Sequence, residues 1–471
     1  MPVETIPALF EHQERAVDFI LKHNGIGALY MDMGTGKTRA AIETFSRLRK
    51  DNPELKMVVI APLSLLASAW GEDIVKFSDF TYYNAHDDGL PKQLKEDILL
   101  INFEAVIQKK NAAIISFIKN NLLVIDESSK LKNHSAKTTK TVLSFKDLPK
   151  YKVIMSGTPA PNSPLEYWGQ MEFLRDWTLH KSFFAFRNSY FHLQRGNQIM
   201  NLQQGQIVSR KMMREIMTKG WQYEITPINL KKLMERINPL IFWAKKEDCL
   251  TLPEQVDEIR TVELSVNQKR IYKEMKNDLI TEIKNTPITA QVALAKLMKL
   301  REITSGFAIN TSGQEMDIGE SPKIDELNEV IDEAGNQQQI IWACFKWDIN
   351  KICSTLQDRF GEGCYRTLYS ATKDHQASIN EFKGGEARFL VANPHSAAHG
   401  LTFTNCSLET FFSLDYSYEY YVQAKARIHR AGQTKSCTYV HLVAKDTIDE
   451  QILKCLREKG DVNQIAYEMM R

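Results

Sequence analysis

The 471-residue chain contains short, nearly continuous apolar segments that are separated by longer polar or amphipathic ones. Apolar strands with helices between them are typical of a parallel sheet that is covered on both faces. The first half is therefore predicted to form an α/β domain. Its apolar segments are Gly27–Met31, Met57–Ile60, Ile98–Ile101, Leu122–Ile125 and Tyr151–Met155.

A second series of apolar segments indicates a second sheet of the same kind. Two stretches with helix-spaced apolar residues, Val266–Ile283 and Ile288–Ile303, precede this series. The chain is thus predicted to consist of two similar α/β halves that join near residue 250. The strand candidates of the second half are Gln339–Ala343, Tyr365–Leu368, Phe389–Ala392, Phe411–Leu414 and Thr438–Val443.

The segment between Trp177 and Tyr223 breaks this pattern, because aromatic and basic residues are interleaved in it. Such interleaving can form a nucleic-acid surface. The other interpretation is a helical insertion whose aromatic side chains pack against the first sheet. After it, Leu230–Asp248 predicts a helix and a connector to the second half.

Composition narrows the class of protein only a little. Lys and Arg number 60 and Asp and Glu number 58, so the whole chain has no basic excess, although a single groove can still be basic. The seven cysteines are scattered without a Cys-x-x-Cys pair, which predicts reduced thiols and neither a disulfide framework nor a zinc site. The N-terminus has no signal-peptide pattern and no apolar run reaches membrane-spanning length, so we expect a soluble intracellular protein with no membrane partner.

A glycine-rich loop, Met33-Gly34-Thr35-Gly36-Lys37-Thr38, lies between an apolar strand and an amphipathic helix, Arg39–Lys50. Glycines there allow successive N–H groups to point at an anion, and the helix N-terminus adds positive potential. Lys37 would reach the β- and γ-phosphates of a nucleotide, and the Thr38 hydroxyl would bind Mg²⁺. The alternative is a tight glycine turn between two elements, since the usual first glycine of such a loop is Met31 here.

An acidic pair, Asp126-Glu127, follows the fourth strand candidate. Ligands bind at the carboxyl ends of the strands in parallel sheets. Beside a phosphate loop, the Asp would hold Mg²⁺ and the Glu would orient or deprotonate the attacking water. The alternative is that the two acids merely begin a helix. The segments that follow the other strands are Ala61-Pro62, Asn102 and Ser156-Gly157-Thr158-Pro159.

Two arginines near the C-terminus, Arg427 and Arg430, are three residues apart, which places them on one face of a predicted helix. They are either salt-bridged surface residues or fingers that act on a γ-phosphate. No acidic residue lies within one turn of them in this segment, which weakens the first interpretation. Further on, Thr447-Ile448-Asp449-Glu450 predicts a capping box at the start of a final helix.

Taken in order, these segments resemble the Swi/Snf (Snf) family of superfamily-two helicase-type ATPases. The most specific match is Gln423–Gln433, QAKARIHRAGQ, which is close to the family signature QAxxRxHRxGQ. Leu300–Phe307 and Ser321–Lys323 are weaker matches, and the whole resemblance spans residues 9 to 455. The remaining matches are His12-Gln13, Met33–Thr38, Ala61-Pro62, Asp126-Glu127 and Ser156–Pro159.

The resemblance implies an α/β fold of two RecA-like lobes, each a mostly parallel sheet flanked by helices, with helical insertions. The expected division is 1–180 for the ATP-binding first lobe, 181–248 for a helical insertion and connector, 249–320 for the helical start of the second lobe, 321–445 for the second lobe itself and 446–471 for C-terminal helices.

The resemblance also implies ATP and Mg²⁺ as cofactors and a role for each matching residue. Thr38 and Asp126 would hold the metal, and Ser156 and Thr158 would couple the nucleotide to lobe closure. The catalytic residues would be Lys37, Asp126, Glu127, Arg427 and Arg430. The nucleotide would be bound by His12, Gln13 (which would recognise adenine), Met33, Gly34, Thr35, Gly36, Lys37, Thr38 and Gln423. DNA phosphates would be contacted by Pro62, Ser64, Asn102, Ser396 and Thr404.

Two positions depart from the family pattern. Ser128-Ser129 follows the acidic pair where the family has Ala-His, which still leaves a hydroxyl for coupling. Thr402 stands where the family has Asn in a glycine-rich stretch, which bears on coupling or DNA contact in the second lobe.

The resemblance implies a minimal motor of the kind that compact bacterial or phage genomes carry. We expect a DNA-dependent ATPase that translocates on double-stranded DNA or remodels protein–DNA complexes. A monomer is expected, in the cytoplasm of a bacterial or phage-infected host cell. The alternatives are a strand-separating DNA helicase and a non-enzymatic DNA-binding protein with a decayed ATP site.

Overall fold

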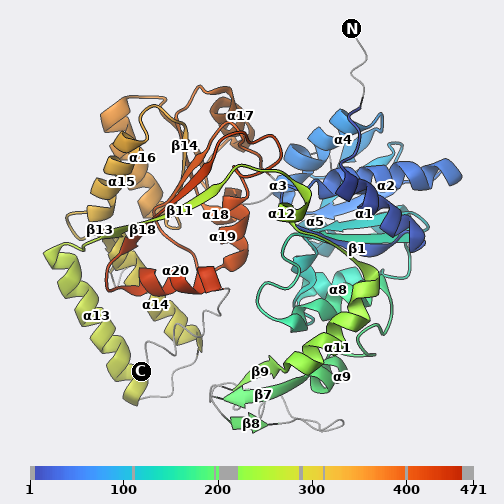
Figure 1. Cartoon of the computed structure of the whole chain (residues 1–471), viewed down its shortest axis with the longest axis horizontal. Coiled ribbons are helices and arrows are strands. Elements are labelled where there is room, and N and C mark those ends of the chain that lie inside the picture. The colour runs from blue at the N-terminus through green and yellow to red at the C-terminus, as the bar shows by residue number, and fades with distance from the viewer. Residues whose placement is uncertain are drawn as a thin grey trace. The chain divides into compact units, whose positions relative to one another are not determined.

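The computed structural model describes residues 6–87, 89–108, 112–195, 198–200, 221–285, 290–310, 313–397 and 401–458. The chain divides into two compact units, Met1–Thr251 and Leu252–Arg471. In Figure 1 the colour runs from blue through green along the first unit and from yellow-green to red along the second. The finer division of the chain at residues 180, 248, 320 and 445 stays a prediction.

The first unit contains a seven-stranded sheet, a small antiparallel sheet and helices of varied length. The strands are β1 Ile26–Met31, β2 Met57–Ala61, β3 Tyr82–Asn84, β4 Ile98–Asn102, β5 Leu122–Asp126, β6 Tyr151–Ser156, β7 Phe191–Arg195, β8 Gln198–Met200, β9 Gln222–Ile225 and β10 Ile241–Ala244. The α-helices are α1 Glu11–Lys22, α2 Lys37–Asp51, α3 Leu63–Leu65, α4 Glu72–Phe77, α5 Phe103–Gln108, α6 Ala112–Ile118, α7 Lys137–Leu143, α8 Tyr167–Leu174, α9 Phe183–Tyr190, α11 Pro227–Ile237 and α12 Lys246–Cys249. A π-helix, η1, spans Leu66–Gly71, and 3₁₀ turns span η2 Ser128–Leu131, η3 Pro164–Glu166 and η4 Asn238–Leu240.

The large sheet has the strand order β10-β1-β6-β5-β2-β4-β3, and its strands pair in parallel. Every residue of β2, β4 and β5 is buried, as expected of strands covered on both faces. Helices α1 and α2 and the π-helix contribute to the core on one face, and α5 to α9 and α11 to the core on the other. Parallel pairing brings the carboxyl ends of β1, β6, β5 and β2 to one edge, side by side.

Two strands of this sheet, β10 and β3, were not predicted. Leu230–Asp248 was expected to form only a helix and a connector, but its residues Ile241–Ala244 form β10, which pairs with β1. The strand is short and lies at the sheet edge, with Trp243 exposed, so its pattern does not resemble that of the buried strands. The edge strands β3 and β11 (Gln255–Val262) were missed for the same reason, since much of each is exposed.

The described part of the aromatic and basic segment packs against the first sheet. Phe186, Tyr190 and Phe191 belong to its core, whereas Phe184 is exposed. The packing of the aromatic side chains agrees with the second interpretation, but the described part of the insertion is not only helical, because β7, β8 and β9 form a three-stranded antiparallel sheet after α9. Residues 196–197 and 201–220 of the segment lie outside the described residues.

The second unit contains a six-stranded sheet, a two-stranded hairpin and flanking helices. Its strands are β11 Gln255–Val262, β12 Phe307–Ile309, β13 Glu315–Asp317, β14 Gln339–Trp342, β15 Tyr365–Leu368, β16 Phe389–Ala392, β17 Leu408–Phe411 and β18 Cys437–Ala444. Its helices are α13 Val266–Asn285, α14 Ala290–Ser305, α15 Pro322–Glu333, α16 Lys346–Phe360, α17 His375–Gly384, α18 Pro394–Ala397, α19 Tyr418–Lys425 and α20 Ile448–Glu458.

The six-stranded sheet is again parallel, in the order β11-β18-β17-β14-β16-β15, and apolar cores cover both of its faces. The predicted fold class, two RecA-like lobes with mostly parallel sheets, is therefore confirmed. One strand was misplaced by three residues, because Phe411–Leu414 was predicted and β17 is Leu408–Phe411. The polar residues Glu409 and Thr410 of this strand are completely buried, so hydrophobicity alone misses its start.

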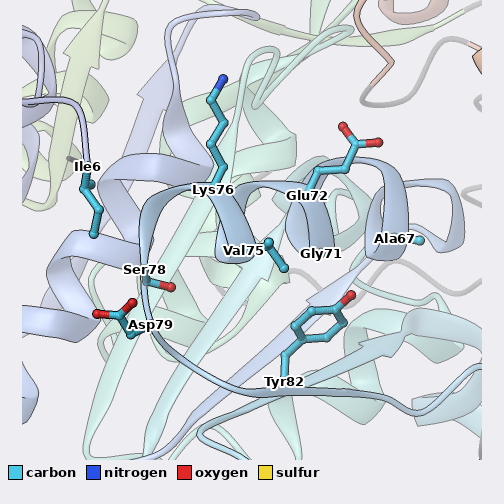
Figure 2. Close-up of a pocket in the computed structure, with 9 residues that line it drawn as sticks. All are labelled: Ile6, Ala67, Gly71, Glu72, Val75, Lys76, Ser78, Asp79 and Tyr82. Carbon is cyan, nitrogen blue, oxygen red and sulfur yellow. The ribbon is translucent and has the colours of Figure 1, made fainter. Parts of the chain in front are cut away.

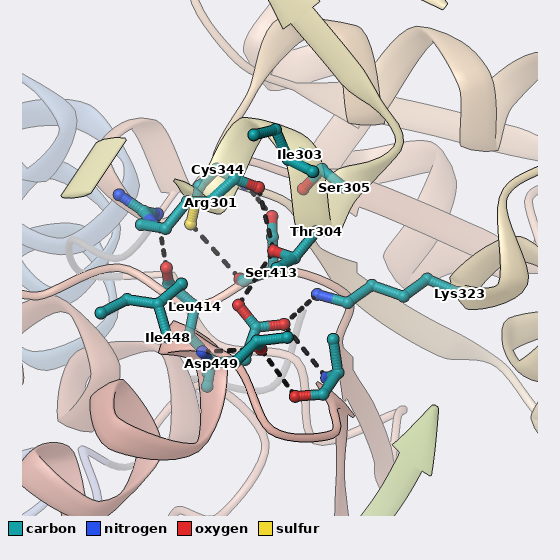
Figure 3. A network of polar contacts seen from close by, with 12 residues as sticks. Arg301, Ile303, Thr304, Ser305, Lys323, Cys344, Ser413, Leu414, Ile448 and Asp449 are labelled. Atoms are coloured by element: carbon teal, nitrogen blue, oxygen red, sulfur yellow. Dashed lines mark hydrogen bonds and ion pairs between the residues drawn. The ribbon is translucent and has the colours of Figure 1, made fainter. Parts of the chain in front are cut away.

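A buried ion pair joins the start of α15 to the start of α20 (Figure 3). The Lys323 ammonium contacts the Asp449 carboxylate at 2.5 Å, and both side chains are almost fully buried. Thr304 Oγ1 and the main-chain N–H of Ala444 also donate to this carboxylate, at 3.0 and 3.2 Å. The capping-box interpretation gave this segment only the role of beginning a helix. Asp449 also forms a buried ion pair and accepts two further hydrogen bonds. A buried charge with this many partners ties the C-terminal helix to the second sheet.

The predicted capping box itself is only partly formed. Thr447 Oγ1 accepts from the N–H of Asp449 at 3.2 Å, two residues into the helix. The Glu450 carboxylate accepts from the N–H of Asp446 at 3.1 Å instead of from Thr447. The reciprocal half of the box is therefore shifted by one residue.

A second buried carboxyl, Asp348 at the start of α16, lies close to this pair. Its Oδ2 accepts from Ser413 Oγ at 2.6 Å and from Ser305 Oγ at 3.3 Å. Its Oδ1 is buried with no hydrogen-bond partner among the described residues. Burial raises the pKa of Asp348 to about 7, although the Ser413 hydrogen bond and the Lys323 charge oppose the rise.

Asp348→Asn should therefore stabilise the second unit more at pH 8 than at pH 5. The folded state holds a proton that the unfolded chain releases near its ordinary pKa, so Asp348 lowers stability as the pH rises from about 4 through about 7. An amide oxygen can accept from both serines without a charge, and the pH-dependent gain should be on the order of a few kcal/mol. Urea unfolding at both pH values measures it.

The matched control is Asp358→Asn, an exposed position on the same helix. It should change the free energy of unfolding by a similar small amount at both pH values. An equal effect of Asp348→Asn at pH 5 and pH 8 would contradict the raised pKa.

Candidate nucleotide-binding site

The glycine-rich loop begins just after the end of β1, and its last two residues, Lys37 and Thr38, lie in the first turn of α2. Gly34 and Gly36 both have φ of 82°, in the left-handed region that favours glycine. A Cβ on Gly36 would also lie 2.1 Å from Gln13 Nε2, so this position excludes a side chain twice over. The 15-residue helix α2 begins directly after Gly36. These features suit the binding of an anion at a helix N-terminus.

Met31, which stands where the usual first glycine would be, is the last residue of β1 and is completely buried. The turn begins only after it, so no left-handed backbone is required there. A residue with a side chain therefore fits this position.

The Lys37 ammonium lies at the carboxyl end of β1. It donates to the carbonyl of Met31 at 2.9 Å and to that of Asp32 at 3.2 Å. Its charge also acts on Asp126 at the end of β5, where it opposes the rise in pKa that burial causes. Thr38 follows in the first turn of α2 and is half-buried. Lys37 and the acidic pair thus lie at the same edge of the sheet.

His12 and Gln13 hold the loop from helix α1. His12 Nε2 lies 2.8 Å from the Thr35 carbonyl, and Gln13 Nε2 donates to the same oxygen at 3.1 Å. Gln13 Oε1 accepts from the main-chain N–H of Phe10 at 3.1 Å. Both side chains are buried, so in this structure they fix the main chain of the loop. The predicted contact of Gln13 with adenine stays a prediction.

A pocket of about 550 Å³ lies beside His12, and its volume is in the usual range for small-ligand sites. It is formed by the start of α1 and the segment around β10, and both aromatic and charged side chains contribute to it. The lining residues are Phe10, Glu11, His12, Arg15, Phe242, Trp243, Ala244, Lys245, Asp248 and Cys249.

The Asp126 carboxylate is oriented by two N–H donors. Trp70 Nε1 donates to Oδ2 at 2.9 Å, and the main-chain N–H of Glu127 donates to Oδ1 at 3.0 Å. Burial raises the pKa of Asp126, whereas the Trp70 hydrogen bond and the Lys37 charge lower it. Trp70 was not predicted as a site residue.

Trp70 reaches Asp126 from the π-helix η1, Leu66–Gly71, which follows the end of β2. π-Helical turns are rare and occur often at functional sites. Trp70 is fully buried on the inner side of this turn. Another side of the π-helix faces a surface pocket of about 730 Å³. Figure 2 shows this pocket, whose lining includes Ala67 and Gly71 of the π-helix together with Val75 and Tyr82.

Glu127 has a strained main chain, with φ of 54° and ψ of 57°. A non-glycine residue in this left-handed region costs about 1–3 kcal/mol, and such strain is concentrated at functional sites. Ser156 Oγ donates to the Glu127 carboxylate at 3.4 Å and accepts from the N–H of Thr158 at 3.1 Å. Thr158 Oγ1 is buried and has no hydrogen-bond partner among the described residues.

Strand order explains why these segments meet. Because β6 lies between β1 and β5, the segment Ser156–Pro159 lies between the glycine-rich loop and the acidic pair. A Cβ on Gly157 would lie 2.8 Å from Met33 Cγ, so the loop packs directly on this segment. The predicted nucleotide-binding residues of the first unit therefore form one cluster with the acidic pair. The cluster consists of His12, Gln13, Met33–Thr38, Asp126 and Glu127.

The donor set of the cluster suits ATP with Mg²⁺. A hydroxyl (Thr38) and a carboxylate (Asp126) are the kind of oxygen ligands that Mg²⁺ takes when phosphates and water complete its shell. Glycine N–H groups and an ammonium are the groups that bind phosphates. Among the described residues, no group of three or more His, Cys, Asp or Glu forms a protein-only metal site.

The two arginines of the second unit do not lie on a helix, contrary to the prediction. Helix α19 ends at Lys425, and the main-chain N–H of Arg427 bonds to Ala424, three residues back, in a tighter turn. Arg427 Nη1 and Arg430 Nη1 nevertheless both donate to the carbonyl of Leu401, each at 2.8 Å. The turn therefore keeps the two guanidinium groups together.

Two further predicted residues lie near these arginines. Thr402, which departs from the family pattern, accepts from Arg430 at 2.6 Å through its hydroxyl. Gln423 is 1% exposed, and its two amide atoms have no hydrogen-bond partner among the described residues. Arg427 Nε donates to the Gln423 carbonyl at 2.7 Å.

The predicted DNA contacts lie in both units. Pro62 and Asn102 are buried, and Asn102 Oδ1 accepts from the N–H of Ala105 at 3.2 Å, within the first turn of α5. Ser64, Ser396 and Thr404 are half-buried. Pro62 directly follows β2 and Asn102 is the last residue of β4, whereas Thr404 lies between α18 and β17. Residues 398–400 of the predicted glycine-rich stretch lie outside the described residues.

Residues 12–306 match a family described as the SNF2-related domain, and residues 322–432 match the helicase conserved C-terminal domain. "Putative protein p41" of Acyrthosiphon pisum secondary endosymbiont phage 1 is 23% identical, over 94% of each chain. The SWI/SNF chromatin-remodeling complex subunit snf22 of Schizosaccharomyces pombe is 24% identical over 97% of this chain, which spans 28% of that protein.

An uncharacterized ATP-dependent helicase of Mycoplasma genitalium is 24% identical over 96% of this chain, which spans 42% of that protein. A solved structure described as the Sulfolobus solfataricus SWI2/SNF2 ATPase core in complex with dsDNA is 23% identical, with a TM-score of 0.45, and 97% of this chain and 92% of that one are covered. No helix within the described ranges is both long and apolar enough to cross a membrane.

Trp70→Phe should weaken the Mg²⁺-dependent part of ATP binding. The phenyl ring fills most of the indole site but removes the N–H that orients Asp126. One lost hydrogen bond of about 1 kcal/mol corresponds to an affinity about fivefold lower. Equilibrium binding of a fluorescent ATP analogue, with Mg²⁺ and with a chelator, measures this part.

Trp177→Phe is the control, because Trp177 is 59% exposed. It should bind the analogue as the wild type does under both conditions. A Trp70→Phe protein with wild-type affinity in Mg²⁺ would show that the hydrogen bond does not prepare Asp126 for the metal.

Proposed function

The chain belongs to the SNF2-related family of helicase-type ATP hydrolases, and we propose that it uses ATP to translocate on double-stranded DNA or to remodel protein–DNA complexes. The observation that carries the proposal is the cluster at the edge of the first sheet. There a phosphate loop follows β1 and an acidic pair follows β5, on the two sides of β6. Both halves of such a motor match family descriptions in one chain.

We assign the nucleotide to this cluster in the first unit. Bound ATP with Mg²⁺ would supply the γ-phosphoryl group and the charge that neutralises it. Lys37 and the N–H groups around Gly34 and Gly36 would bind the phosphates, and Thr38 and Asp126 would hold the metal. Glu127 would orient the attacking water and take its proton. The base would occupy the pocket beside His12, because His12 lines this pocket and also contacts the main chain of the loop.

The second unit would act on the same nucleotide through Gln423, Arg427 and Arg430. Two guanidinium groups held on one carbonyl are suited to stabilise the charge that develops on a transferred phosphoryl group. The buried amide of Gln423, which has no hydrogen-bond partner within the described ranges, is a polar group to which a ligand or a rearranged neighbour would bind.

DNA would be held by each unit separately, through Pro62, Ser64 and Asn102 in the first and Ser396 and Thr404 in the second. Binding and hydrolysis of the nucleotide would then move the two sets of DNA contacts relative to each other. Ser64 lies just before the π-helix that carries Trp70, so a DNA contact there is covalently close to the partner of Asp126. We further propose a monomer that acts in the cytoplasm of a bacterial or phage-infected cell, which the phage relative supports.

A strand-separating helicase is the second candidate, and it would need a wedge between the strands. The described part of the aromatic segment packs Phe186 and Tyr190 into the core, which leaves little there to act as a wedge. Trp177 and Phe184 are exposed and are the remaining candidates in that part. A binding protein with a decayed ATP site is disfavoured because Lys37, Asp126 and Glu127 are present and clustered.

Duplex DNA should raise ATP turnover more than single-stranded DNA, forked DNA or RNA. The five conditions, including one without nucleic acid, are measured in parallel. Lys37→Ala should lower turnover by at least about 100-fold, as the loss of one strong phosphate donor does. The wild type should displace a triplex-forming strand from a duplex.

Each rival predicts a different outcome of these assays. Separation of a forked duplex without triplex displacement would favour the helicase. Turnover that no nucleic acid increases would exclude the motor. Full cellular activity of Lys37→Ala would favour a non-enzymatic protein.

Arg427→Ala and Arg430→Ala should each lower ATP turnover by about 10³-fold while ATP binding is nearly kept, because fingers act mainly in the transition state. Turnover and equilibrium binding are measured for both variants, and thermal unfolding shows whether the loss of the Leu401 contacts destabilises the second unit. Arg359→Ala, which removes a surface pair with Asp332, is the control. Unchanged turnover in a folded Arg430→Ala protein would reduce this arginine to a structural role.

A further inference from the structure

Gln170, in helix α8, is completely buried and uses both ends of its amide. Its Oε1 accepts from Ser128 Oγ at 2.7 Å and from Tyr30 OH at 2.9 Å. Its Nε2 donates to the carbonyl of Pro159 at 2.7 Å and to that of Glu166 at 3.1 Å. An amide with two acceptor sites and two N–H donors has no capacity left beyond these four bonds.

Three of the four partners come from segments of the nucleotide cluster. Tyr30 precedes the glycine-rich loop, Ser128 directly follows the acidic pair, and Pro159 ends the Ser-Gly-Thr-Pro segment. Glu166 alone belongs to the turn that leads into α8. Gln170 is therefore a single side chain that joins the ends of β1, β5 and β6 from the face of the sheet that α8 covers.

The position of α8 is fixed one residue before Gln170. A Cβ on Gly169 would lie 2.4 Å from the Leu131 carbonyl, so the helix packs directly on the 3₁₀ turn that follows Glu127. This close approach lets the Gln170 amide reach Ser128 without intervening atoms. The distance between the helix and the acidic pair is thus set by main-chain contact.

The contact with Ser128 matters because of the residue before it. Glu127 adopts a left-handed main chain that costs free energy, and such a conformation persists only when its neighbours hold it. On one side Glu127 is held by the Asp126 carboxylate. On the other side the completely buried Ser128 is held by Gln170. A hydroxyl is available at this position because the chain has Ser128 where the family pattern has Ala.

We propose that Gln170 is a positioning residue for hydrolysis. Through Ser128 it keeps Glu127 in its strained conformation, and through Pro159 it links the acidic pair to the Ser156–Thr158 segment. This link runs parallel to the direct contact between Ser156 and Glu127. The inference deepens the proposed function, since it rests on Glu127 acting on the attacking water.

Ser128→Ala and Gln170→Met remove the two ends of the contact. Each should lower kcat for ATP by about tenfold, the equivalent of about 1.4 kcal/mol in the barrier, because Glu127 loses its fixed geometry. The KM for ATP and the equilibrium affinity for an ATP analogue should stay within about twofold, since the phosphate loop is untouched. The double variant should lose no more than the worse single variant, because both changes remove one interaction.

Tyr30→Phe is the matched control. It removes the other hydrogen bond to the same Gln170 oxygen and leaves the Ser128 contact in place. It should destabilise the fold about as much as Ser128→Ala does, with kcat near that of the wild type. Thermal unfolding of all variants is measured beside the kinetics. If Gln170→Met does not fold, Ser128→Ala against Tyr30→Phe remains the decisive comparison.

The results separate this inference from the proposed function. Wild-type turnover that DNA stimulates, with kcat unchanged in Ser128→Ala, would overturn the positioning role and leave the motor in place. An equal loss of kcat in Tyr30→Phe and Ser128→Ala would also overturn it, since the effect would then follow stability alone. A wild type without nucleic-acid-stimulated turnover would instead refute the proposed function.

Discussion

The position of one strand determines the chemistry of the first unit. Because β6 is inserted between β1 and β5, the segment Ser156–Pro159 lies between the glycine-rich loop and the acidic pair. Its Gly157 contacts Met33 of the loop, and its Ser156 contacts Glu127. The loop and the acidic pair are therefore connected by directly packed atoms of a single segment.

Around this strand the site is supported by a set of buried hydrogen bonds to its main chain and side chains. Trp70 orients Asp126, Gln13 and His12 hold the main chain of the loop, and Gln170 holds the residue after Glu127. Buried hydrogen bonds of this kind stabilise one geometry over its alternatives. The site is thus held from several directions at once, which allows Glu127 to retain an unfavourable main chain.

The sequence predicts the buried strands well, because fully buried strands have a continuous apolar pattern. Prediction fails where burial is partial or polar, as at the edge strand β10 and at Glu409 of β17. The arginine pair was found by motif, but its turn was not, since the carbonyl of Leu401 is distant in sequence. Trp70 gives no sequence signal, whereas Gln170 gives a faint one as the lone amide in an otherwise largely apolar helix.

The π-helix at Leu66–Gly71 has a consequence for how this chain tolerates insertions and deletions. A π-turn contains one residue more than an α-turn, and each residue of an α-helix adds about 100° of rotation. Removing a single residue there would relax the turn to α-helix and rotate Trp70 away from the Asp126 carboxylate. A surface helix elsewhere can lose one residue and re-pack. This turn, in contrast, determines the direction in which the Trp70 side chain points. The length of this turn is therefore tied to the Trp70–Asp126 contact.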